Sequence, residues 1–80
     1  MYVENFDSEL FLKSFGLNLS RIRKEKGFSQ EKLANEADID ISTLSRIERG
    51  ILNISIVNTY KISISLGITH QELFNFKLKD

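Results

Sequence analysis

The chain of 80 residues contains no cysteine and no proline, and it has no long apolar run. Without cysteine it can form neither a disulfide framework nor a thiolate zinc site, which suits a reducing compartment. No run approaches the roughly 20 apolar residues that span a membrane. The opening residues, MYVENFDSEL, carry acids where a signal peptide carries basic residues. We therefore expect a soluble cytoplasmic protein with no membrane partner.

The sequence also lacks an excess of charge, because 11 Lys and Arg balance 11 Asp and Glu to a formal net charge of +0. Non-specific affinity for nucleic acid comes mostly from neutralisation of phosphates by Lys and Arg, so a neutral chain has little of it. Seven basic residues and six acids are interspersed between residues 20 and 50. Any positive surface is therefore expected to be a patch rather than a whole face.

Glycine is scarce, and three of its four copies, at 27, 50 and 67, fall where helices should end. Between them the apolar spacing predicts an all-α fold of five helices at about 8–26, 30–37, 41–49, 56–66 and 70–76. A chain of this length forms one small domain, here 1–80, which buries only about 60–65% of its unfolded surface. Such a domain is marginally stable alone, and dimerisation is the obvious source of further stability.

The two ends of the chain are predicted with different detail. Residues 1–7 hold Tyr2, Val3 and Phe6 among polar neighbours, and they could extend the first helix, pack on the domain edge or stay loose. At the other end, Thr69 and Glu72 have the spacing of a capping box that starts the last helix. The single histidine, His70, is expected to be an ordinary residue at the start of that helix.

Residues 29–50, SQEKLANEADIDISTLSRIERG, have the pattern of two short helices joined by a tight turn. Ser29 and Asp40 are the candidate N-caps, Ile39 lies in the turn, and Gly50 can take a left-handed C-terminal conformation. The apolar positions recur at helical spacing in both helices: Leu33, Ala34 and Ala37 in the first, Leu44, Ile47 and the stem of Glu48 in the second.

The opposite side of the second of these helices is polar and basic, with Ser42, Ser45, Arg46 and Arg49. Short hydroxyl side chains permit close approach to a DNA major groove, and an arginine can give guanine two hydrogen bonds. Serine and arginine also form ordinary solvated helix faces. The face alone therefore leaves both interpretations open.

The motif around this face resembles the helix-turn-helix of the Xre and lambda-repressor-like (Cro-type) family. The matching residues are Gln30-x-x-Leu33-Ala34 and the run Ser42-Thr43-Leu44-Ser45-Arg46-Ile47-Glu48-Arg49-Gly50, and the resemblance extends over about residues 16 to 74. It implies a compact five-helix DNA-binding domain whose partner is double-stranded DNA. Copies of this fold are also reused for contacts with proteins.

The resemblance assigns contact roles to individual residues. Gln30 is expected to touch the DNA backbone and to brace the start of the recognition helix. Base readout is expected from Ile41, Ser42, Thr43 and Arg46, with Ser45 close by, and Arg46 is the candidate for guanine. Backbone contacts fall to Arg49 and Asn53. Arg23 and Glu48 are expected to form a partly buried structural ion pair rather than to read DNA.

Two positions depart from the family pattern. Ile41 stands where a polar residue is common, and its side chain could pack on a thymine methyl group or merely cover the turn. After Gly50 the chain has Ile51-Leu52-Asn53-Ile54 in place of the usual basic residues and proline. This loop removes expected phosphate contacts, which favours weak DNA affinity or an apolar contact with protein.

The fourth predicted helix carries more apolar residues than one core needs. Ile56, Ile62, Ser63 and Leu66 are expected on the core side, whereas Val57, Tyr60 and Ile64 lie more than about 120° away. We expect this second stripe, together with Phe74, to form a dimer interface within residues 56–78, to which Phe76 and Leu78 could add. The alternative is that a terminal segment of the same chain covers it.

These observations predict a homodimeric, sequence-specific transcriptional regulator of bacterial or phage type that binds a palindromic operator. Restriction-modification controller proteins are the most similar subgroup, and small phage repressors and antitoxin subunits have similar outlines. The competing class is a protein-interaction module that keeps the fold without binding DNA. With no phosphate loop, metal cluster or second histidine, we expect no enzyme activity, cofactor, metal or small-molecule ligand.

Overall fold

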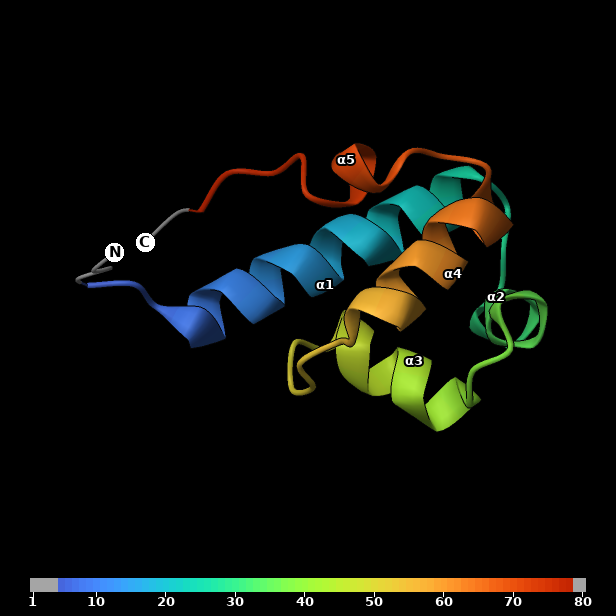
Figure 1. The fold of residues 1–80 in the computed structure, drawn as a ribbon, viewed down its shortest axis with the longest axis horizontal. Helices are drawn as coiled ribbons and strands as arrows, with labels where there is room; N and C mark the ends of the chain where they lie inside the picture. Colours follow the sequence, from blue (N-terminus) through green and yellow to red (C-terminus); the bar gives the residue numbers. More distant parts are fainter. Residues whose placement is uncertain (1–4, 79–80) are drawn as a thin grey trace.

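The computed structural model describes residues 5–78, which form five α-helices and no strand (Figure 1). The helices are α1 (Ser8–Glu25), α2 (Gln30–Ala37), α3 (Ile41–Glu48), α4 (Ile56–Leu66) and α5 (His70–Leu73). The predicted all-α class with five helices is confirmed. The first four helices agree with the prediction to within one residue, but the last ends at Leu73 instead of continuing to residue 76.

Side-chain caps explain where most of these helices begin. Asp7, Ser29, Ser55 and Thr69 each accept a hydrogen bond from the backbone N–H three residues later, which satisfies one of the free donors of a first turn. Thr69 and Glu72 form the predicted capping box. Asp40 occupies the N-cap position of α3, as predicted, but its side chain makes no capping hydrogen bond.

The turn between α2 and α3 is closed by a left-handed residue. Asp38 has φ 56° and ψ 54°, and its N–H bonds the carbonyl of Asn35 while the N–H of Ile39 bonds that of Ala34. Aspartate tolerates this conformation better than most side chains. Ile39 lies in this turn as predicted, where it is half-buried and packs on the core.

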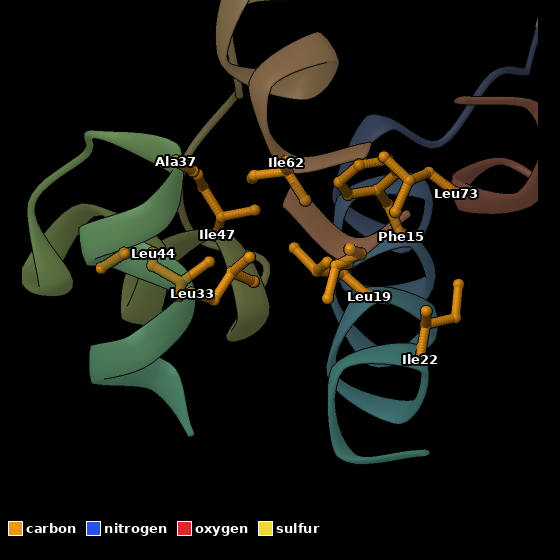
Figure 2. Close-up of a cluster of buried hydrophobic side chains, with 11 residues drawn as sticks. Phe15, Leu19, Ile22, Leu33, Ala37, Leu44, Ile47, Ile62 and Leu73 are labelled. Carbon is orange, nitrogen blue, oxygen red and sulfur yellow. The ribbon is translucent and has the colours of Figure 1, made fainter. Parts of the chain in front are cut away.

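The hydrophobic core receives side chains from all five helices (Figure 2). Helices α2 and α3 supply one side, α1 supplies the other, and Ile62 of α4 lies between them. Its buried apolar members are Phe15, Leu19, Ile22, Leu33, Ala34, Ala37, Leu44, Ile47, Ile62, Leu66 and Leu73. The core thus fixes α3 against α1 and α2 through the inner face predicted from the sequence.

Two glycines allow α1 to lie directly against the end of α3. A Cβ atom at Gly16, in the middle of α1, would sit 2.5 Å from the carbonyl oxygen of Ile47. A Cβ at Gly50 would lie 2.6 Å from the Cα of Lys13, and Gly50 also has φ 76°. Only glycine meets both conditions there without strain. The backbone of the third helix is therefore held at close range by the first.

The last helix is short because the first helix caps its end. Buried Asn18 of α1 donates from Nδ2 to the carbonyl oxygens of Glu72 (3.0 Å) and Leu73 (2.9 Å). The chain then leaves the helix, and Phe74 packs on Phe15 with ring centroids 5.1 Å apart. Helical periodicity could not predict this end, because the partner that stops the helix is distant in sequence.

Five of the six phenylalanines meet where the two ends of the described chain lie together (Figure 1). The Phe11 ring is 5.8 Å from that of Phe6 and 5.6 Å from that of Phe76. Of the segment at residues 1–7, Phe6 therefore packs on the domain edge through its ring, one of the three alternatives left open. Tyr2 and Val3 lie outside the described residues.

The inner side of α4 differs from the prediction at its first residue. Ile62, Ser63 and Leu66 are buried as expected, but Ile56 is 89% exposed. Thr59 is buried instead, and its hydroxyl donates to the carbonyl of Ser55 at 2.9 Å. The prediction placed Ile56 in the core because it is apolar, whereas it lies at the very start of the helix, beyond the edge of the core.

Candidate nucleic-acid interface

The outer side of α3 and its C-cap present the side chains that sequence reasoning selected for contact with DNA. Ser42, Arg46 and Arg49 are exposed, whereas Thr43 and Ser45 are half-buried at the edges of this face. The opposite face is anchored, since Leu44 and Ile47 are almost fully buried. A short helix held in this way projects a fixed set of hydrogen-bonding groups into solvent, which is what insertion into a major groove requires.

A buried ion pair ties α1 to the end of α3. The Nε of Arg23 donates to Oε2 of Glu48 at 2.6 Å, and its Nη2 donates to Oε1 at 3.0 Å. The two side chains are only 9% and 6% exposed. A two-point contact between buried opposite charges fixes the relative position of both backbones, and neither charge can be left without the other at low cost.

Gln30, the first residue of α2, joins the same carboxylate. Its Nε2 donates to Oε1 of Glu48 at 2.9 Å. Glu48 is the last residue of α3, so the glutamine braces the end of that helix; the expectation that it braces the start is wrong. A carboxylate can only accept, which forces the amide nitrogen toward Glu48 and leaves the second hydrogen on that nitrogen for another acceptor.

The start of α2 is suited to bind an anion. The hydroxyl of Ser29 accepts from the N–H of Lys32, and the carbonyl of Ser29 accepts from the N–H of Leu33. The N–H groups of Gln30 and Glu31 have no acceptor among the described residues. These two donors, the positive end of the helix dipole and the nearby ammonium of Lys32 together favour a phosphate.

The basic residues between residues 20 and 50 differ in whether they are available for contact with phosphate. Arg23 is buried in its ion pair with Glu48 and is not available to DNA. Arg21 forms an ion pair with Glu25 one turn along α1. The Nζ of Lys32 lies 4.5 Å above the ring of Phe28. Between residues 20 and 50, the exposed basic residues that make no ion pair within the described chain are Lys24, Lys26, Lys32, Arg46 and Arg49. These five side chains are therefore available for contacts with phosphate.

The loop between α3 and α4 has only one exposed residue among its three apolar ones. Leu52 and Ile54 are half-buried against the core, which leaves Ile51 at 60% exposure and Asn53 exposed. Two of the three apolar residues therefore anchor the loop. Asn53 remains accessible for the backbone contact expected of it.

The apolar residues selected for dimerisation share one exposed surface. Val57, Tyr60 and Ile64 of α4 are 64%, 57% and 61% exposed, and Phe74 is 47% exposed. No terminal segment covers them within the described residues. A hollow of about 220 Å³ adjoins this surface and is lined by Ile56, Thr59, Tyr60, His70 and Phe74. Sequence reasoning missed the contributions of Ile56 and His70, because one was assigned to the core and the other was treated as ordinary.

Residues 5–78 contain neither a membrane-spanning helix nor a metal-binding cluster. No helix there is long and apolar enough to cross a membrane. No group of three or more His, Cys, Asp or Glu side chains in that range could hold a metal ion.

Comparisons with known proteins match this arrangement. A family model described as Helix-turn-helix (HTH_3) matches residues 19–73. Control protein C.MunI from Mycoplasma sp is 50% identical over 62 residues, which span 76% of this chain and 84% of that protein. The crystal structure of the restriction-modification controller protein C.AhdI from Aeromonas hydrophila has a TM-score of 0.78 and 43% identity, covering 79% of this chain and 96% of that one.

A further match is a structure solved with nucleic acid. SinR, described as the master regulator for biofilm formation and crystallised in complex with DNA, has a TM-score of 0.72 and 37% identity, covering 76% of this chain and 98% of that chain. The family match begins inside α1 and ends at the last residue of α5. Phe6, Phe11, Phe15, Phe74 and Phe76 lie outside the matched range.

Proposed function

Because the chain belongs to the helix-turn-helix (HTH_3) family of DNA-binding regulators, we propose that it is a transcriptional regulator of the restriction-modification controller type. In this proposal it binds a palindromic operator as a homodimer and acts in the cytoplasm, where bacterial or phage DNA lies. It reads sequence through α3 and requires no catalytic residue, cofactor or small-molecule ligand.

The observation that carries the proposal is the rigid mounting of an exposed polar helix. Arg23, Glu48 and Gln30 hold the end of α3 against α1 and α2, while Ser42 and Arg46 face outward. A solvated helix face needs no such support. A reading helix does, because hydrogen bonds to base edges depend on side chains being placed within a fraction of an ångström.

Contacts with DNA divide between positioning and reading. We assign phosphate contacts to Gln30, Arg49 and Asn53, and base contacts to Ile41, Ser42, Thr43, Ser45 and Arg46. Phosphate contacts set the orientation of the domain, whereas groups at base edges determine which sequence is bound. With only five exposed basic residues outside ion pairs between residues 20 and 50, specific binding depends more on base contacts than on charge.

The homodimer is assigned to the apolar surface formed by Val57, Tyr60, Ile64 and Phe74, within residues 56–78. These four large side chains would remain in water in a monomer, and contiguous exposed apolar surface marks a contact site. A two-fold axis through it would present two α3 helices to successive major grooves about 34 Å apart. Two weak half-site contacts then act as one binding event.

The experiment that tests this function is selection of bound sequences from a random duplex pool with purified protein at near-physiological salt. A palindromic consensus with half-sites about one helical turn apart is the expected result. An absence of enrichment with folded protein would contradict the proposal and favour a protein-interaction module. Two observations favour this second function, the exposed Ile51 and the net charge of +0.

A further inference from the structure

Ile41 is an exposed apolar side chain at the first position of α3. It is 49% exposed, whereas the other two apolar residues of the helix, Leu44 and Ile47, are at most 1% exposed. At about 100° per residue, Ile41 lies one helical turn before Ser45 and next to Ser42, at the edge of the exposed face of the helix. It is thus the one apolar group on an otherwise polar reading face.

Covering the turn does not account for this side chain. The turn between α2 and α3 is filled by Ile39, which is half-buried and packs against the core. Ile41 is absent from the partly buried residues that contact the core. Asp40, the adjacent N-cap, makes no side-chain bond that would need shielding. Within this domain the exposed half of Ile41 therefore has no packing partner.

On this basis we propose that Ile41 is a specificity-determining residue that reads the 5-methyl group of a pyrimidine in the major groove. The inference depends on the DNA-binding function proposed above. The first residues of a recognition helix approach base edges most closely, and the only apolar group that B-DNA presents there is the methyl at C5 of thymine. 5-Methylcytosine carries the same group at the same ring position, so the ligand class is a 5-methylpyrimidine.

The expected size of the effect follows from the area that becomes buried. Removing one methyl group from water against an aliphatic side chain changes affinity by about fourfold. A dimer has one such contact in each half-site, so loss of both methyl groups should weaken binding about 16-fold. This change is well above the error of a titration and well below the loss of a charged hydrogen bond.

The test uses the selected operator with uracil substituted for thymine, position by position and symmetrically in both half-sites. Uracil lacks only the 5-methyl group and keeps the Watson–Crick pairing. We expect one position at which uracil weakens wild-type binding about 16-fold, and we expect Ile41→Ala to bind both duplexes equally. A duplex with 5-methylcytosine paired with guanine there should bind more tightly than the unmethylated cytosine duplex, by a similar factor.

Ile51→Ala is the matched control, because Ile51 is also an exposed isoleucine but lies beyond α3. It should keep the wild-type response to uracil. Equal binding of thymine and uracil operators at every position would overturn the inference while leaving the DNA-binding function intact. An equal loss on uracil in wild type and Ile41→Ala would overturn it too. Failure of the wild type to select any operator would instead refute the proposed function.

Discussion

Replacement of Glu48 by alanine should destabilise this domain more than loss of any exposed charge. The carboxylate accepts three hydrogen bonds, two from Arg23 and one from Gln30, and its side chain is 6% exposed. Removing one member of a buried pair leaves the other charge uncompensated and costs about 3–5 kcal/mol. Small domains have total stabilities of about 0.05–0.15 kcal/mol per residue, so the loss is a large fraction of the whole.

The assay is thermal unfolding followed by circular dichroism, at one fixed protein concentration because dimerisation adds to apparent stability. For a domain of this size about 1 kcal/mol shifts Tm by roughly 4–8 °C, so Glu48→Ala should lower Tm by at least about 12 °C. A fall of less than about 4 °C would refute the view that the buried pair holds α3.

Glu25→Ala is the matched control. Glu25 bonds Arg21 at 2.9 Å, but both side chains are more than half exposed, so this pair contributes only about 0–0.5 kcal/mol. The double variant Arg23→Met/Glu48→Leu supplies a second check. Replacing both charges by apolar groups removes the penalty of an unpaired charge, and it should recover a large part of the stability lost in Glu48→Ala.

Three further predictions concern packing, reading and assembly. Gly16→Ala should cost about 1–3 kcal/mol in denaturant unfolding, because its Cβ would meet the backbone carbonyls at the end of α3; an unchanged midpoint would contradict the close approach. Arg46→Ala should cost about 1–3 kcal/mol at the selected operator and relax base choice at one position; a uniform loss on all sequences would show a phosphate contact instead. Tyr60→Asp and Ile64→Asp should each give a folded monomer by sedimentation; a dimeric Tyr60→Asp and Ile64→Asp would refute the assigned interface.

The helices were predictable because their signals are local. Apolar spacing set the inner faces of α2 and α3, and Ser29 and Thr69 started helices through hydrogen bonds to residues three positions away. The resemblance to the Xre and lambda-repressor-like family is confirmed by the family match, since its motif lies in one continuous segment. Element order and family therefore needed no knowledge of distant contacts.

The predictions that failed concern features that depend on contacts with residues distant in sequence. The last helix ends early because Asn18, more than 50 residues away, bonds its final carbonyls. Ile56 is apolar and helical but falls beyond the edge of the core that Thr59 and Ile62 define. Gln30 bonds the end of α3 rather than its start, because the buried carboxylate of Glu48 is the acceptor within its reach.

The sequence by itself determined the five helices, the two-helix motif with its polar outer face, and the presence of surplus apolar residues on α4, because each depends on spacing within one short segment. Only the tertiary structure decided how those faces are used. It joined Arg23, Gln30 and Glu48 into one network, left Ile41 49% exposed, and exposed Val57, Tyr60 and Ile64 beside Phe74. Burial and pairing are properties of residues that are close in space, and their separation in sequence does not specify them.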